Sequence, residues 1–252
     1  MNKKACQTLK KSLILCLGVC LLFLTGCGLD VYTIIPAPYS TIHTPVYTTE
    51  YDNRYFSFFT NEKEFDNEGG VKFQGTEIYY KIYSSYSNMT SQTERLQSLA
   101  SSDDTSSSAS STLITTYGYK ALKAQGYTDS PLIPYKGENQ QVYIRLSDYG
   151  DLDAFASKIL INNSSLIESE NRTIPVRNTS DRTTFNFGRN GTLDVVPKNG
   201  DEDVNYTSMS DGNKWYVAMF AVAVGIDYLY SPYYSNILYL GAVTIDADST
   251  NN

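Results

Sequence analysis

Residues 215–224 restrict the fold of this chain more than any other segment, because they are apolar at nearly every position. Alternate side chains of a strand point to opposite faces of a sheet. One face here carries Val217, Met219 and Ala221, and the other carries Tyr216, Phe220, Val222 and Val224. An antiparallel sheet usually presents polar groups on one face, so both apolar faces need a cover. We expect the sandwich interior on the first face and a helical insertion on the second, with a partner protein as the alternative cover.

Alternation of period two dominates the chain from residue 54 onward and predicts a mainly β domain. Residues 71–83 show it best. One face of that strand carries Ile78, Tyr80 and Ile82, and the other carries Tyr79, Lys81 and Tyr83. The remaining predicted strands are residues 55–60, residues 141–147 with Val142, Ile144 and Leu146 inward, an edge strand at 172–178 interrupted by Pro175, and residues 237–245. Residues 154–161 fit a strand or a helix.

Residues 184–196 predict a β-hairpin. Asn190 and Gly191 are the favoured pair for a two-residue type I′ turn. In such a hairpin, Phe185 and Phe187 would lie opposite Leu193 and Val195. These two aromatic residues would therefore add to the core.

One region, residues 88–136, departs from the alternation and predicts a helical insertion. Ser91 and Glu94 fit a capping box at a helix start, and Gly126 is a plausible helix stop. Apolar residues recur at intervals of four, as on one face of a helix: they are Ala109, Leu113, Tyr117 and Ala121. The serine-rich stretch 101–111 predicts a flexible segment within the insertion.

The N-terminal segment has the features of an export signal. Four lysines lie in the first eleven residues, residues 12–25 are an apolar run, and Leu-Thr-Gly-Cys closes it at residues 24–27. The run is shorter than the roughly 20 apolar residues of a membrane-spanning helix, and an ordinary secretory signal would not need the cysteine. The segment resembles the lipobox of bacterial lipoproteins, in which the chain is cut before the cysteine and the thiol is diacylated. This resemblance implies that Cys27 is the lipidated first residue of the mature protein.

Removal of residues 1–26 would change the chemistry of the chain. Cys6, Cys16 and Cys20 would be lost with them, and Cys27 would be acylated, so the mature domain would contain no disulfide. Sixteen basic residues would remain against 27 acidic ones, a net charge of −11. This charge argues against nucleic acid or an anionic lipid surface as the main partner. His43, the only histidine, lies in a proline-containing stretch, which argues against nucleophilic catalysis with an imidazole base.

Two predicted strands resemble those of fibronectin type III and related immunoglobulin-like sandwiches. Residues 75–80, Gly-Thr-Glu-Ile-Tyr-Tyr, are similar to the third strand of that family, although Thr76 stands where an aromatic residue is usual. Residues 215–225 resemble its sixth strand. Residues 77–83, Glu-Ile-Tyr-Tyr-Lys-Ile-Tyr, are also similar to a strand of uncharacterised spirochaete-type envelope lipoproteins. This second resemblance implies an envelope location and no particular activity.

These features predict four parts of the chain. Residues 1–26 form a lipoprotein signal peptide, and residues 27–53 form a lipid-anchored tether in which Pro36, Pro38 and Pro45 prevent continuous secondary structure. Residues 54–247 form an immunoglobulin-like or fibronectin III-like β-sandwich that carries the helical insertion. Residues 248–252 form a disordered tail.

The candidate binding site is the loop between the last two predicted strands. It contains Tyr228, Tyr230, Tyr233 and Tyr234, and tyrosine-rich loops favour binding because they offer large contact area at low entropy cost. The alternative is that these rings only pack the loop, since the chain holds 22 tyrosines.

Acidic clusters are weaker candidates for a site. Asp148, Asp151 and Asp153 lie in one turn, and Asp201, Glu202 and Asp203 lie in another. Calcium prefers clustered carboxylates, but neither spacing matches a known loop, and solvated turns are commoner. We expect no metal, no cofactor and no catalytic residue.

The sequence therefore predicts a lipid-anchored protein of the cell membrane or outer membrane that faces the periplasm or the exterior. Its expected role is binding, adhesion or structural display without catalysis, with a protein or glycan partner. A hydrolase that acts on envelope glycan through paired carboxylates is the alternative. A second alternative is an accessory subunit of an envelope complex.

Overall fold

The computed structural model describes residues 34–45, 50–65, 70–102, 107–150, 152–189, 194–208 and 210–247. They belong to one compact unit, Ile34–Asn252. The predicted signal peptide, Cys27, the turn at Asn190 and Gly191, Asp151 and the predicted tail at 248–252 lie outside the described residues. The described chain is mainly β with antiparallel sheets, as the alternation predicted.

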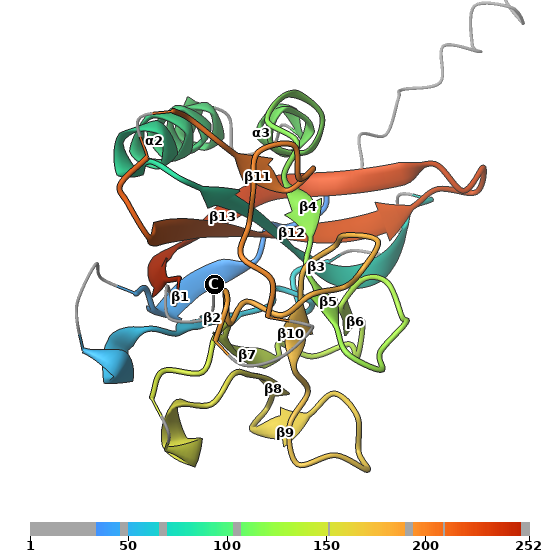
Figure 1. The fold of residues 1–252 in the computed structure, drawn as a ribbon. Coiled ribbons are helices and arrows are strands. Elements are labelled where there is room, and N and C mark those ends of the chain that lie inside the picture. Colours follow the sequence, from blue (N-terminus) through green and yellow to red (C-terminus); the bar gives the residue numbers. More distant parts are fainter. Residues whose placement is uncertain are drawn as a thin grey trace, which may run out of the picture. The chain divides into compact units, whose positions relative to one another are not determined.

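The main sheet is built around two long antiparallel strands, β3 (Lys72–Tyr83) and β12 (Lys214–Ile226). A third long strand, β13 (Pro232–Asp246), pairs with the other side of β12. Three short strands pair with β3: they are β4 (Lys120–Ala121), β6 (Ile133–Pro134) and the parallel strand β11 (Val204–Asn205). In the part of the chain that the structure describes, β12 is therefore flanked on both sides and β13 is an edge strand (Figure 1).

The second sheet has the order β1-β2-β7-β8-β9. Its strands are β1 (Tyr39–His43), β2 (Phe56–Phe59), β7 (Gln141–Arg145), β8 (Lys158–Ile161) and β9 (Ser164–Ser165). A separate two-stranded sheet joins β5 (Lys123–Ala124) to β10 (Pro175–Val176). Two short 3-10 helices, η1 (Tyr51–Asn53) and η4 (Asp153–Phe155), lie in connections.

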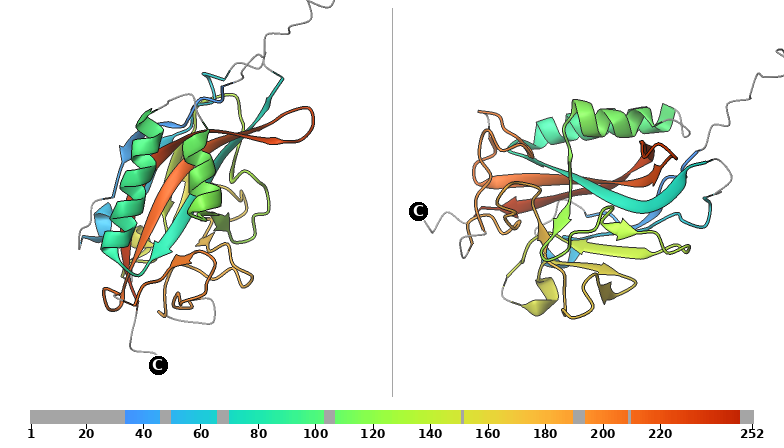
Figure 2. Two further views of the ribbon diagram at one scale, coloured as in Figure 1. Left: turned by 90° about the horizontal axis from the view of Figure 1, so that it is seen from above. Right: turned by 90° about the vertical axis from the view of Figure 1, so that its right-hand side faces the viewer.

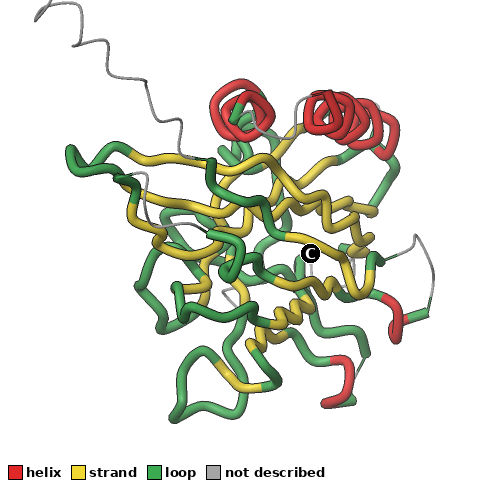
Figure 3. The backbone as a smooth tube through the Cα atoms, turned by 180° about the vertical axis from the view of Figure 1, so that it is seen from behind, coloured by secondary structure: helices red, strands yellow, loops and turns green. Residues whose placement is uncertain are grey.

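The helices cover the face of the main sheet that points away from the second sheet (Figure 2, right). They are α2 (Tyr86–Ser102), α3 (Ser108–Ser111) and the π-helical turn η3 (Thr112–Thr116) that continues α3. From behind, α2 and α3 lie side by side on the strands (Figure 3). The domain thus has three layers: helices, main sheet and second sheet.

Two apolar clusters fill the spaces between these layers. The cluster between the sheets contains Val217, Met219 and Ala221 of β12, with Ile78, Tyr80 and Ile82 of β3 and Val142, Ile144 and Leu146. The cluster beneath the helices contains Tyr216, Phe220 and Val222 of β12, Tyr79 and Tyr83 of β3, and Met89, Leu96, Ala109 and Leu113. The predicted faces of β3 are confirmed, and so are those of β12 except at Val224, which is half-buried and belongs to neither cluster. The helical cover over the outer face of β12 is also confirmed.

The boundaries of the helical insertion differ from the prediction. Helix α2 begins at Tyr86, so Ser91 and Glu94 lie inside it and form no capping box. Its first amide group is bound instead by the carboxylate of Asp211, at 2.8 Å from Tyr86 N. The sequence around Ser91 could not reveal this cap, because Asp211 lies more than a hundred residues later in the chain.

The end of the insertion is also different. Gly118, with φ +64°, follows the helical segment, whereas Gly126 lies beyond β5. Residues 120–134 return to the sheets as β4, β5 and β6, so Ala121 lies on a strand. Ala109 and Leu113 are buried as expected, and the partly buried Tyr117 and Ala121 pack against the same cluster. The spacing of four thus identified the buried positions but extended the helix too far.

The predicted hairpin at 184–196 is not formed in its described part. Phe185 and Phe187 are fully buried in the core between the sheets, but they lie in turns, and Val195 is 44% exposed. Asp194, at the end of this segment, accepts hydrogen bonds from Thr184 and from the amide of Gly188. Burial of the two phenylalanine side chains therefore holds this segment in place, and regular strand pairing does not.

The described part of the predicted tether belongs to the domain. Strand β1 pairs with β2, and Ile35 is buried with Phe65, Val71, Phe73 and Ala223. The register of β1 against β2 shifts twice, and the strand lies between Pro38 and Pro45. The apolar residues near the start of the segment explain the difference, because a free linker would leave Ile35 in water.

We predict that Leu113→Ala destabilises the domain by about 2–5 kcal/mol, because it opens a cavity between the helices and β12. Leu113 is fully buried, whereas Thr116 on the same helical segment is exposed. Urea denaturation of both variants would measure the difference. Thr116→Ala should unfold close to the parent protein, and an equal loss in both variants would contradict the packing role of Leu113.

Candidate functional site

The predicted tyrosine loop is the tip of the β12–β13 hairpin. The side chain of Asp227 accepts hydrogen bonds from the amides of Leu229 and Ser231, each at 2.8 Å. The backbone adds bonds from Tyr230 N to Asp227 O and from Asp227 N to Ser231 O, each at 3.1 Å. Tyr230 has φ +63°, which completes the tight turn. These bonds fix the shape of the tip without any contribution from its large side chains.

The large side chains of the tip point into solvent. Tyr228 and Tyr230 are each 82% exposed, and Leu229 between them is 67% exposed. Tyr233 is 42% exposed, whereas Tyr234 packs against the cluster beneath the helices. The structure therefore brings three of the four predicted tyrosines to the surface. Leu229, which the tyrosine pattern did not indicate, is exposed beside them.

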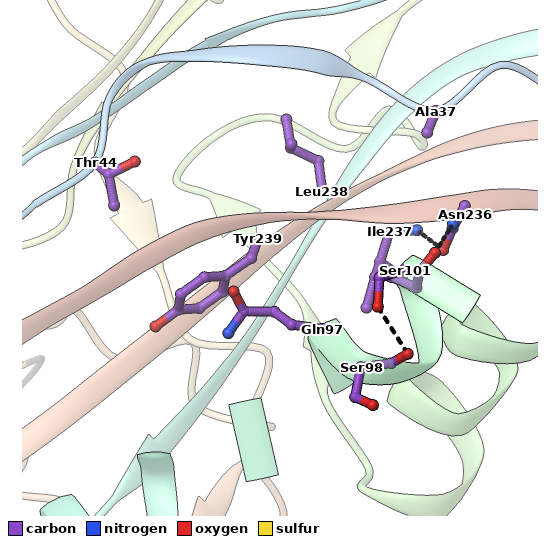
Figure 4. Close-up of a pocket in the computed structure, with 10 residues that line it drawn as sticks. Ala37, Thr44, Gln97, Ser98, Ser101, Asn236, Ile237, Leu238 and Tyr239 are labelled. Carbon is purple, nitrogen blue, oxygen red and sulfur yellow. Dashed lines mark hydrogen bonds between the residues drawn. The ribbon is translucent and has the colours of Figure 1, made fainter. Parts of the chain in front are cut away.

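A groove of about 940 Å³ lies between helix α2 and strand β13 (Figure 4). Gln97, Ser98, Ala100 and Ser101 of α2 form one wall, and Ala37 and Thr44 form another. The floor is formed by residues 236–239 of β13. A hydrogen bond of 2.8 Å from Asn236 Nδ2 to Ala100 O joins the floor to the helix.

This groove follows the edge of β13. Ile237 packs in the cluster beneath the helices, and Leu238 packs against the core between the sheets. These two neighbours point to opposite faces of the main sheet, so a groove that reaches both must run along the strand edge. β13 pairs with β12 alone among the described strands.

The described lining of the groove is neutral. It combines hydroxyl and amide groups with apolar side chains, and among its described residues Tyr239 is the only titratable one. Burial raises the pKa of Tyr239 above its ordinary value, and a hydrogen bond with Thr93 opposes that rise. Tyr239 therefore stays protonated near neutral pH. The described lining thus offers hydrogen bonds and apolar contact, and it contains no general base.

A buried ionic cluster lies beneath the main sheet. The guanidinium group of Arg177 binds Asp203 through Nε and Nη2, at 2.9 and 2.6 Å, and binds Asp201 at 2.8 Å. Asp203 also accepts a hydrogen bond of 2.6 Å from the hydroxyl of Tyr80. The Arg177 side chain is 2% exposed and that of Asp203 is fully buried. Burial and the neighbouring carboxylate of Asp203 raise the pKa of Tyr80 well above its ordinary value.

This cluster corrects the prediction of a solvated acidic tip at residues 201–203. Only Glu202 is exposed, where it forms an ion pair of 2.8 Å with Lys120. Asn199 and Gly200 precede this segment and indicate a turn, but the sequence could not show that Arg177 would lie against Asp201 and Asp203. The cluster joins β3 to the loops around residues 177 and 201, so its evident role is structural.

The other acidic candidate is also engaged in internal bonds. Asp148 accepts hydrogen bonds from Ser157 N at 2.7 Å and from Asn186 Nδ2 at 2.8 Å. Asp153 is the first residue of the short helix η4. Among the residues that the structure describes, no group of three histidine, cysteine or acidic side chains has the arrangement of a metal site.

The predicted tether 27–53 would make His43 a solvated linker residue, but the structure places it in the domain. It is the last residue of β1, its ring stacks on Tyr55 with 3.9 Å between centroids, and its Nε2 lies 3.1 Å from Asn53 O. Its partly buried ring is used in packing β1 against the domain.

Comparison with known proteins finds no matching family model, no matching curated protein and no matching solved structure. Within the described residues, none of the helices combines the length and the apolar character needed to cross a bilayer. The groove was not predicted, because residues 37, 97–101 and 236–239 come together only through the fold. A long apolar strand at the end of the chain is the one sequence signal that could have suggested an open edge there.

We predict that Arg177→Met destabilises the domain by about 3–5 kcal/mol, because it leaves the fully buried Asp203 without its partner. Lys120→Ala, which removes an exposed ion pair, should cost less than about 1 kcal/mol. Thermal or urea unfolding of both variants would test this. Equal stabilities of the Arg177 variant and the parent protein would contradict a structural role for the cluster.

Proposed function

We propose that this chain is a lipid-anchored protein of the bacterial cell envelope, held by acyl groups on Cys27, that binds a partner without catalysing a reaction. The observation that carries the binding role is the groove along the edge of β13. It exposes a strand edge between a helix and the segment 37–44, and its walls contain neutral hydrogen-bonding groups. The lipobox resemblance of residues 24–27 supports the anchor and the membrane location.

An extended polypeptide is the partner that this groove fits best. A strand edge carries amide and carbonyl groups that can pair with another strand, and peptide recognition by strand addition uses such edges. Amide and hydroxyl groups of Gln97, Ser98 and Ser101 would then bind polar side chains of the guest. A glycan is the alternative ligand, since the same groups can bind sugar hydroxyls.

We also propose that the domain is of the fibronectin type III or immunoglobulin-like kind. The order β3-β12-β13 agrees with the neighbouring third, sixth and seventh strands of such sandwiches, and β1-β2-β7 agrees with their other sheet. The helical layer and the strands β8 and β9 would be additions to that plan. Kinship with spirochaete-type envelope lipoproteins rests on residues 77–83 alone.

A glycan hydrolase is the competing function. A polar pocket of about 700 Å³ contains Asp181, Asp201 and Glu202. However, Asp201 binds Arg177 and Glu202 binds Lys120, each at 2.8 Å. Glycoside hydrolysis needs two carboxyl groups that face each other across the substrate, and carboxylates already paired with cations suit that task poorly. An accessory subunit of an envelope complex would use the same groove to bind its neighbour.

The groove can be tested with a photo-crosslinking residue at position 98 of the full chain in its native cells. We expect one defined crosslinked product, because Ser98 lines the groove. Position 94 on the same helix is exposed and does not line the groove, so the control should give none. Ser98→Trp, with the crosslinker at position 101, should abolish the product. Products of equal yield from positions 94 and 98 would contradict a binding role for the groove.

Acylation can be tested by metabolic labelling. We expect palmitate to label the parent protein, and we expect Cys27→Ser to lose the label and to remain unprocessed. Cys20→Ser is the matched control, because Cys20 lies in the segment that is removed, and it should behave as the parent. An unlabelled parent protein would overturn the proposed anchor.

A further inference from the structure

The exposed tip of the β12–β13 hairpin is an unusual surface for a protein in water. Tyr228, Leu229 and Tyr230 are the three most exposed large apolar or aromatic residues among those described. They are consecutive in the chain, and the tip that carries them extends beyond the rest of the main sheet (Figures 1 and 2). Exposed apolar groups that gather in this way mark an interaction surface.

The tip is already fixed in shape before it meets a partner. Asp227 binds the amides of Leu229 and Ser231, and the hairpin register continues to the pair Ile226–Pro232 at the base of the turn. Little backbone entropy would therefore be lost on binding. Both bonds are accepted by one oxygen of Asp227, Oδ1.

The chain emerges from the domain at the same end as this tip. Ile35 is buried beside Val71 and Ala223, and its Cδ1 would lie 2.9 Å from a Cβ atom placed on Gly225. Gly225 is two residues before the turn at Asp227. Ile34, the first described residue, is 52% exposed. The first described residues of the chain thus lie at the base of the hairpin tip.

This position matters because the anchor is close in sequence. Cys27 precedes Ile34 by seven residues, which span at most about 25 Å when fully extended. A membrane that held acyl groups on Cys27 would therefore lie near the tip end of the domain. A weak contact between tip and membrane would then be intramolecular in effect and would be favoured by a high effective concentration.

We propose that Tyr228, Leu229 and Tyr230 insert into the headgroup region of the membrane that carries the anchor. This inference rests on the proposed anchoring at Cys27. Tyrosine suits that region because its ring is apolar and its hydroxyl remains hydrated, and aromatic residues are enriched at membrane interfaces. Leu229 would reach the boundary of the acyl chains. Anchor and tip together would fix the orientation of the domain and leave its opposite end facing away from the membrane.

The test uses residues 27–252, whose only cysteine is Cys27. Its thiol is coupled to a maleimide lipid in phosphatidylcholine vesicles, with and without bromine on the acyl chains. The substitution Tyr230→Trp places a fluorescent tip probe on the hairpin, and bromine quenches only a probe that reaches the lipid. The native Trp215 is 7% exposed and gives the background, which the parent protein measures.

The substitution Tyr206→Trp supplies the matched control probe. Tyr206 is 45% exposed and follows β11, whose Asn205 pairs with Tyr83 at the other end of β3 and β12. We expect a blue shift and strong quenching of the tip probe, and no quenching of the control probe above the background. Adding Tyr228→Ser and Leu229→Ser to the Tyr230→Trp protein should remove most of the quenching, while circular dichroism shows that the fold is kept.

Each outcome decides the proposal. If the tip probe is quenched no more than the control probe, the tip does not enter the membrane, and a protein partner becomes its explanation. If the tip probe remains fully quenched after both serine substitutions, the tip side chains do not drive insertion and the proposal also fails. Chemical coupling supplies the anchor in every case, so these results do not depend on whether cells acylate Cys27. Palmitate labelling tests that point separately.

Discussion

Burial of β12 on both of its faces is the constraint on which the rest of the structure depends. Its alternating side chains supply both apolar clusters, one between the two sheets and one beneath the helices. A strand with two apolar faces needs a layer packed against each face of its sheet. In this domain β12 also has a neighbouring strand on each side. The helices α2 and α3 are therefore a part of the core, although they interrupt the order of strands in the sequence.

The regular part of this arrangement could be predicted from local patterns. Alternation at residues 78–83 and 216–222 assigned side chains to the correct faces, because a strand fixes side-chain direction with a period of two. The excess of apolar residues on the second face of β12 required a cover. The interval of four from Ala109 identified two of the helical residues that provide it, Ala109 and Leu113. Each of these inferences used residues close together in the sequence.

The remaining features depend on contacts between distant residues. Asp211 caps α2, Arg177 neutralises Asp203, and residues 37, 98 and 237 meet only in the groove. No local pattern carries such information. The tip of the hairpin is an intermediate case: its tyrosines were visible in the sequence, but their exposure and the course of the chain beside Gly225 required the structure. A candidate membrane contact and a candidate binding groove thus lie on one strand pair, β12–β13.

The pairing of β3 with β12 also determines when, during synthesis of the chain, the domain can complete its fold. Ile82 lies opposite Val217, with the helices and the whole of the second sheet beyond β1 and β2 encoded between them. Such distant pairing makes folding slow. While the ribosome is still synthesising the chain before residue 214, β3 lacks its long partner β12, and the apolar side of α2 lacks the strand that it covers. Neither apolar cluster can therefore be completed until β12 has been translated, and a chain with an incomplete core is easier to unfold and thread through a narrow pore.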